Sequence, residues 1–124
     1  MGTIKRFEDI QAWQKSRETT RQIYEITSHV GFAKDFVLRD QLRRATVSIM
    51  LNIAEGFGRR TDREFSRFLF HAHGSATEVQ SALYVALDQG YIEHKKFDEL
   101  YASIDEISKM LLSFSKYLLT KSED

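Results

Sequence analysis

An apolar repeat of seven residues in the last quarter of the chain indicates the class of fold. Apolar residues recur there at alternating spacings of three and four, at Phe97, Leu100, Ile104, Ile107, Leu111, Phe114 and Leu118. This spacing places the side chains on one side of an α-helix, as in the seam of a coiled coil or a left-handed helical bundle. We therefore expect a long helix that packs against other helices along its length.

Glycines divide the rest of the 124-residue chain into segments that fit the same helical pattern. Gly31, Gly56 and Gly90 each follow an apolar periodicity, at positions where a left-handed glycine often ends a helix. The predicted helices span residues 8–30, 35–56, 62–90 and 95–121.

The links between these helices are about four to six residues long, which is typical of antiparallel neighbours in a bundle. The chain contains no proline to interrupt a helix. Thr61 and Glu64 have the spacing of a capping box at the start of the third helix. We predict an all-α fold, namely an antiparallel up-down-up-down left-handed four-helix bundle that comprises residues 1–124 as a single domain.

Composition excludes several classes of protein. The chain has no cysteine, which rules out disulfide scaffolds, thiolate metal sites and a cysteine nucleophile. No apolar run approaches the roughly 18 residues of a membrane span, and the N-terminal sequence lacks the apolar region of a signal peptide. We expect a soluble, cytoplasmic protein without membrane contact.

The second predicted helix is apolar on two opposite sides. One stripe contains Leu38, Leu42, Ile49 and Ile53, and the other contains Phe36, Val47, Leu51 and Ala54. A helix that is apolar nearly all round needs more neighbours than one four-helix bundle readily supplies. Either this helix is deeply central, or its second stripe meets another subunit. We favour the second interpretation and predict an oligomer interface at Phe36, Val47, Leu51 and Ala54.

Polar residues fall between these stripes and face similar residues of the third helix. The set that we predict to form a buried polar network comprises Gln41, Ser48, Asn52, Glu55, His71, Ser75 and Glu78. Buried polar groups require hydrogen-bond partners, so an interhelical network is the first interpretation. The alternative is a metal or acid–base site at Glu55, His71 and Glu78. A di-iron bundle would need two Glu-x-x-His motifs, which the sequence lacks, so we expect no metal, no cofactor and no catalytic residues.

Arginines concentrate near the start of the third helix, although the net charge of the chain is zero. Positive side chains there oppose the helix dipole, which suggests an anionic partner. Arginine also binds phosphate through two parallel hydrogen bonds. The candidate nucleic-acid or anion-binding residues are Arg43, Arg44, Arg59, Arg60, Arg63 and Arg67. Ion pairs with a protein partner or within an assembly are the other interpretation.

Several motifs resemble those of a known family. They are Phe7-Glu8-Asp9-Ile10-x-Ala12-Trp13-Gln14-Lys15, then Gln41-Leu42-Arg43-Arg44-Ala45, Asn52-Ile53-Ala54-Glu55-Gly56-x-Gly58-Arg59, Glu64-Phe65-x-Arg67-Phe68-Leu69 and Gly90-Tyr91-Ile92. The chain is similar to the bacterial four-helix-bundle proteins encoded by intervening sequences in large-subunit ribosomal RNA genes. That family is distantly similar to the accessory variability proteins of diversity-generating retroelements.

The resemblance implies a ring-like homopentamer with no known enzymatic activity. The retroelement proteins are basic and bind nucleic acid and a reverse transcriptase, whereas this chain has zero net charge. We therefore predict a non-enzymatic homo-oligomeric binding or scaffold protein. A nucleic-acid-binding accessory protein with an RNA, DNA, reverse-transcriptase or acidic protein partner is the main alternative, and a carboxylate/His metal-dependent enzyme is the third.

Overall fold

The heptad residues of the C-terminal helix pack into the centre of the molecule. A computed structural model describes residues 4–123, in which the helix α5 spans His94–Glu123. Within the predicted seam Phe114 is half-buried, and the other six residues are buried. The long helix and its apolar seam are confirmed.

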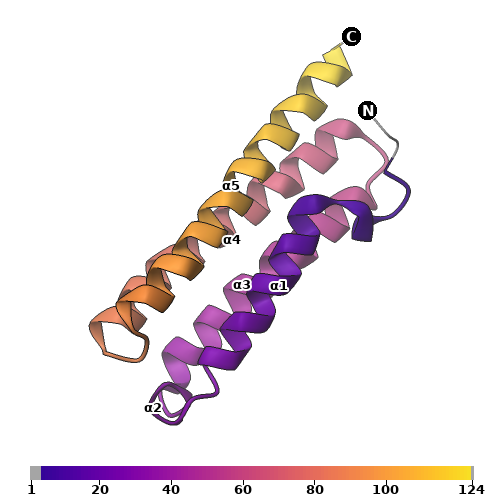
Figure 1. Ribbon diagram of the computed structural model, residues 1–124. Helices are drawn as coiled ribbons and strands as arrows, with labels where there is room; N and C mark the ends of the chain where they lie inside the picture. The colour runs from indigo at the N-terminus through magenta and orange to yellow at the C-terminus, as the bar shows by residue number, and fades with distance from the viewer. Residues whose placement is uncertain (1–3, 124) are drawn as a thin grey trace.

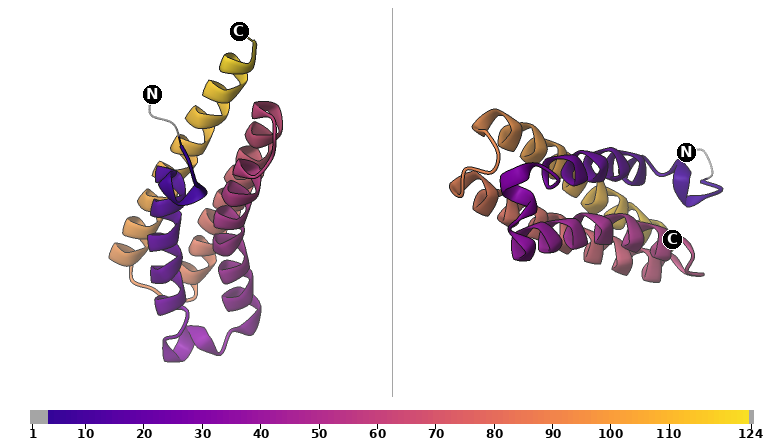
Figure 2. Two further views of the ribbon diagram at one scale, coloured as in Figure 1. Left: turned by 90° about the vertical axis from the view of Figure 1, so that its right-hand side faces the viewer. Right: turned by 90° about the horizontal axis from the view of Figure 1, so that it is seen from below.

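Four long helices lie side by side, as Figures 1 and 2 show. α1 (Gln11–Ile26) contacts α3 (Phe36–Phe57) and α5, while α4 (Asp62–Asp88) contacts both α3 and α5. A 3₁₀ turn, η1 (Phe7–Asp9), precedes α1, and a four-residue helix, α2 (Val30–Ala33), precedes α3. Residues 4–123 contain no strand, so the fold is all-helical as predicted. None of these helices is long and apolar enough to cross a membrane.

The first predicted helix, over residues 8–30, is in fact divided into three elements. Ile10 has an extended backbone, with φ −76° and ψ 121°, and separates η1 from α1. At the other end, the hydroxyls of Thr27 and Ser28 donate to the carbonyls of Ile23 and Tyr24, each at 2.7 Å. These side chains compete for the last carbonyl groups of the helix, which ends α1 at Ile26.

The three dividing glycines have different roles. Gly90 follows α4 with φ +73° and ends that helix as predicted. The prediction is wrong for the other two, because Gly31 lies inside α2 and Gly56 lies inside α3. Gly56 is buried against α4, where an added Cβ would stand 2.8 Å from Cβ of Phe68. Its role is therefore close helix packing.

Side chains cap the two central helices. The Thr61 hydroxyl accepts from the Glu64 amide at 3.1 Å, and the Asp35 carboxylate accepts from the Leu38 amide at 3.1 Å. In a capping box the Glu64 carboxylate would also accept from the Thr61 amide. It accepts instead two hydrogen bonds from Arg67, at 2.9 and 3.0 Å.

Pairs of hydroxyl groups join three of the helix–helix contacts. Thr20 and Thr46 join α1 to α3 with 2.9 Å between their Oγ1 atoms, and Ser48 and Ser75 join α3 to α4 with 2.9 Å between their Oγ atoms. A buried pair with an Oγ–Oγ distance of 2.5 Å joins α4 to α5 at Ser66 and Ser115. Each pair satisfies a hydrogen bond only at one relative height of its two helices, so these pairs favour a single register.

Candidate functional site

Three residues of the predicted polar network meet between α3 and α4. The Ser48 hydroxyl pairs with that of Ser75, and the Asn52 amide donates to the Ser48 hydroxyl at 3.0 Å and to the Ser48 carbonyl at 2.9 Å. Ser75 is buried, while Ser48 and Asn52 are half-buried. The polar contact predicted between these two helices therefore exists, but it is short.

The other four members of the predicted network are exposed on the single chain, which corrects their predicted burial. They are Gln41, Glu55, His71 and Glu78. They lie at the edge of the contact between α3 and α4. At such an edge, a small rotation of either helix about its axis decides whether a side chain is buried or exposed. Across the described residues, no three His, Asp or Glu side chains are placed to hold a metal ion, so Glu55, His71 and Glu78 form no such site within one chain.

The second stripe of α3 lies on the outside of the bundle. Phe36 and Leu51 are each 63% exposed, and Val47 and Ala54 are half-buried. Val37, which is 84% exposed, extends this surface. We call these five residues the α3 ridge. An apolar ridge along an outward helix face is unusual on a soluble monomer.

Two of the candidate arginines are held by neighbouring side chains. Arg59 pairs with Glu55 at 2.5 Å, and Arg67 pairs with Glu64 at 2.9 Å. Both guanidinium groups also lie over the ring of Phe68, at 4.6 and 4.9 Å from its centroid. The Arg67 hydrogen bonds lower the pKa of Glu64 below its usual value. These arginines are therefore partly neutralised and fixed in position.

Arg43 is occupied at the end of α1. Its guanidinium donates to the hydroxyls of Thr27 at 2.8 Å and Ser28 at 3.1 Å, and lies 4.6 Å from the ring centroid of Tyr24. A cation near the C-terminus of a helix is favoured by the helix dipole. Arg43 thus stabilises the fold. The remaining candidates, Arg44, Arg60 and Arg63, are exposed.

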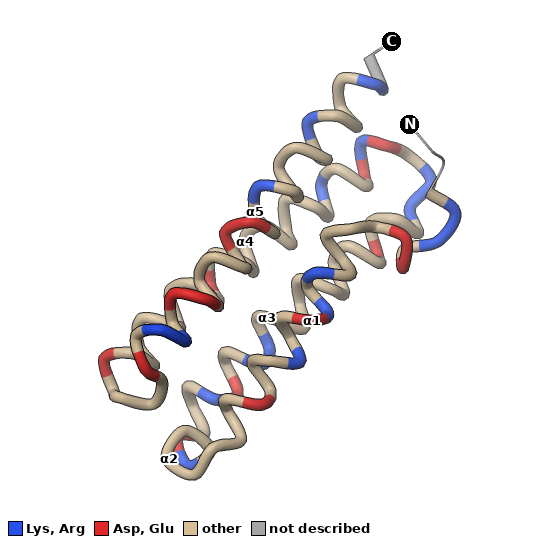
Figure 3. The backbone as a smooth tube through the Cα atoms, in the orientation of Figure 1, with Lys and Arg blue, Asp and Glu red and all other residues tan. Residues whose placement is uncertain are grey.

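Basic residues gather at the end of the bundle that carries both termini (Figure 3). Residues 109–123 of α5 contain three lysines and one acidic residue, Glu123, and residues 59–67 contain four arginines against Asp62 and Glu64. At the opposite end, residues 88–99 contain two lysines against four acidic residues. These segments of the two ends therefore differ in net charge, although residues 34–44 at the second end add four basic residues against two acidic ones.

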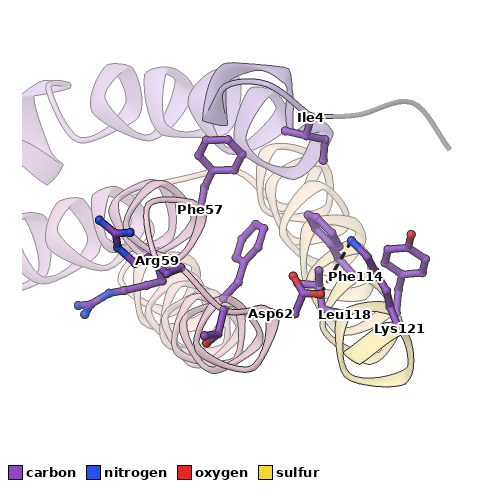
Figure 4. A pocket seen from close by; sticks show the side chains of 11 residues that line it. Ile4, Phe57, Arg59, Asp62, Phe114, Leu118 and Lys121 are labelled. Carbon is purple, nitrogen blue, oxygen red and sulfur yellow. Dashed lines mark ion pairs between the residues drawn. The ribbon is translucent and has the colours of Figure 1, made fainter. Parts of the chain in front are cut away.

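A cavity of about 300 Å³ opens at the basic end (Figure 4). Apolar side chains from α3, α4, α5 and the N-terminal segment line it, together with the ion pair of Asp62 and Lys121, whose charged atoms are 3.8 Å apart. The lining residues are Ile4, Phe57, Arg59, Arg60, Thr61, Asp62, Phe65, Phe114, Tyr117, Leu118 and Lys121. Arg59 extends to the side away from Lys121 (Figure 4). Sequence reasoning missed this cavity, because its residues come from segments whose relative heights no sequence pattern specifies.

The comparisons with known proteins agree with the helical architecture. Residues 8–113 match the family described as 23S rRNA-intervening sequence protein. A crystal structure from Bacteroides thetaiotaomicron, of a protein with unknown function from the S23 ribosomal protein family, is similar with a TM-score of 0.77 and 28% sequence identity. The similarity covers 85% of this chain and 98% of that chain. No functionally curated protein matches the sequence.

Proposed function

The chain belongs to the 23S rRNA-intervening sequence protein family, and from this premise we propose that it is a non-enzymatic, self-associating helical bundle that serves as a binding scaffold in the cytoplasm. The observation that carries the proposal is the α3 ridge, with Phe36 and Leu51 each 63% exposed. Burial of such side chains against another chain contributes about 25 cal/mol for each Å² removed from water, which offsets the loss of translational and rotational freedom on association.

The assembly that we propose is a closed ring, each copy of which is an antiparallel up-down-up-down left-handed bundle. A contact between unlike surfaces must close into a ring or grow into a filament, and only a ring gives a defined mass. Five copies is the number implied by the resemblance to the family. The similarity to retroelement proteins and a reverse-transcriptase partner rest on that resemblance alone and stay predictions.

Light scattering with a matched pair of variants tests the self-association. Val47→Glu combined with Leu51→Lys places two charges on the α3 ridge and should reduce the wild-type mass to that of one 14.5 kDa chain. The control combines Val30→Glu with Leu119→Lys, which changes two exposed apolar residues outside α3 and should leave the mass unchanged. Circular dichroism should show the same helical content in all three proteins. A wild-type mass of 14.5 kDa would refute the proposal.

A second candidate function, nucleic-acid binding, is favoured by the basic end of the bundle (Figure 3). Arg60 and Arg63 are exposed there, and Arg60 lines the same cavity as Lys121 of α5. Binding to RNA and DNA should weaken steeply with salt, because phosphate contacts release counterions. Replacing Arg60 and Arg63 with Gln should flatten this dependence by about one unit of log–log slope per lost contact. The matched control, Arg17→Gln with Arg21→Gln on α1, should not. No binding at low salt would exclude this function.

A further inference from the structure

We infer that the α3 ridge of one copy packs against the outward face of α4 on the next copy, with Gly74 receiving the ridge. This inference rests on the proposed self-association and specifies its partner surface, a second copy of this chain. The contact joins two unlike surfaces, so every copy uses its α3 ridge on one side and its α4 face on the other.

The α4 face contains a glycine that the single chain does not need. Gly74 lies in the middle of the 27-residue helix, is exposed, and has no described atom within 4 Å of an added Cβ. Glycine in a helix interior is less favourable than alanine, so a reason for it must come from outside the bundle. Exposed apolar residues lie on the same face, with Phe70 one turn away at 48% and Val85 about three turns away at 45% exposure. Gly74 therefore leaves open space beside Phe70 for an incoming side chain.

Two contacts between α3 and α4 show which residues of the two helices lie at the same position along the bundle axis, which we call the same height. Ser48 meets Ser75, and Gly56 meets Phe68, so residue numbers that rise along α3 fall along α4. Val47 and Leu51 are therefore level with Ala76 and Ala72, and Gly74 lies between those two heights. Rotation about an axis parallel to the helices keeps every height unchanged. In such a ring the two ridge residues Val47 and Leu51 lie on either side of the neighbour's Gly74.

Two further matches occur at the same register. Phe36 and Val37 are level with residues 86 and 87 of α4, within about one helical turn of the exposed Val85. Arg44 is level with residue 79, beside Glu78. Both charged side chains are exposed, and neither makes an ion pair within the described part of the chain. Apolar groups thus face apolar groups, a cation faces an anion, and bulky side chains face a glycine.

The positions of the two surfaces also suit a closed ring. α3 and α4 are neighbours in the bundle, so their outward faces point about 90° apart. Unlike faces about 90° apart close a ring of four copies, and faces about 108° apart close a ring of five. α3 and α4 run alongside each other along their lengths (Figure 2).

Disulfide cross-linking tests which surfaces meet. Because the chain has no native cysteine, only the introduced cysteines can form a disulfide. Leu51→Cys and Gly74→Cys are made in separate chains, mixed and oxidised mildly. The mixture should give a covalent dimer within the assembly, whereas either variant alone should give none. Leu51→Cys mixed with Ala102→Cys on the exposed side of α5 is the matched control and should not cross-link.

Charge reversal tests the register independently. Arg44→Glu and Glu78→Arg should each weaken assembly by about tenfold or more, because like charges then face each other. Mixing the two variants should largely restore assembly, since alternation of the two chains pairs opposite charges at every contact of an even ring and at four of the five contacts of a five-membered ring. Restoration in the mixture cannot come from a contact within one chain.

The failure of this inference is distinct from the failure of self-association. A wild-type protein of one-chain mass would end both. An oligomer in which Leu51→Cys cross-links with itself, or in which the Leu51→Cys and Gly74→Cys mixture stays uncoupled, would overturn the α3–α4 contact and leave the scaffold proposal standing. An oligomer whose charge-reversed variants stay dissociated when mixed would contradict the register.

Discussion

Two glycines in long helices should respond oppositely to the same substitution. An alanine Cβ at position 56 would stand 2.8 Å from Cβ of Phe68 and 2.9 Å from the ring of Phe65, so α3 and α4 must separate. We expect Gly56→Ala to lower the free energy of unfolding by about 1–3 kcal/mol, as other overpacked sites do. Gly74→Ala has open space and should raise the free energy of unfolding by about 1 kcal/mol.

Urea unfolding of both variants measures these changes. The background should be the Val47→Glu and Leu51→Lys protein, so that association does not contribute. Equal effects at the two positions would mean that α4 does not approach α3 at Gly56 as described.

A single phenol links the two loops at the other end of the bundle. The Tyr91 hydroxyl donates to the Asp35 carboxylate at 3.0 Å, and its ring stacks on Phe32 with 5.0 Å between centroids. The hydrogen bond to Asp35 raises the pKa of Tyr91 above its ordinary value of about 10. The bond therefore stabilises the folded protein below that value, and its contribution disappears as the pH rises through the folded pKa.

Tyr91→Phe should remove this dependence on pH. Between about pH 8 and about pH 11 the wild type should lose more free energy of unfolding than the variant, whose loss comes from the remaining groups alone. Urea unfolding of both proteins across this range measures the difference. Identical pH profiles would show that the phenol is not coupled to folding.

At the scale of the helices, the hydroxyl pairs should be energetically coupled. Ser66 and Ser115 are buried and bonded to each other across α4 and α5. Ser66→Ala or Ser115→Ala alone should cost about 1 kcal/mol, because the remaining buried hydroxyl keeps only a longer bond to a backbone carbonyl, at 3.5 or 3.3 Å. The double variant should cost less than the sum of the two, since no hydroxyl is then left unpaired. Additive effects in a double-mutant cycle of urea unfolding would contradict the pairing.

Sequence patterns predicted the long helices well, but they predicted poorly where the helices end and which side chains are buried at the edges of helix–helix contacts. The α5 heptads identify a buried seam because seven residues repeat one direction, so an error at one position changes little. The end of α1 depends on individual hydrogen bonds from Thr27 and Ser28, which no periodicity reveals. The polar network failed at Glu55 and His71 for a similar reason, because burial at the rim of a helix contact depends on the exact rotation of both helices.

For the molecule as a whole, association should make stability depend on concentration. A ligand that binds only the folded state stabilises it by mass action, and in the proposed assembly the ligand is another copy of the chain. The urea midpoint of the wild type should rise with protein concentration, and that of Val47→Glu with Leu51→Lys should stay constant. Midpoints that stay constant for both proteins would mean that folding and association are not linked.

The position of three lysines in the last part of α5 has a consequence for any ring whose axis runs parallel to the helices. Rotation about such an axis keeps the lysine-rich end of every α5 on the same side, so the electric dipoles of the copies add together. The ring then presents the lysines of every α5 on one face only, and an anionic surface that binds these lysines would hold the ring in one orientation. A twofold axis across the helices would cancel the dipoles instead, so the dielectric response in solution distinguishes the two symmetries.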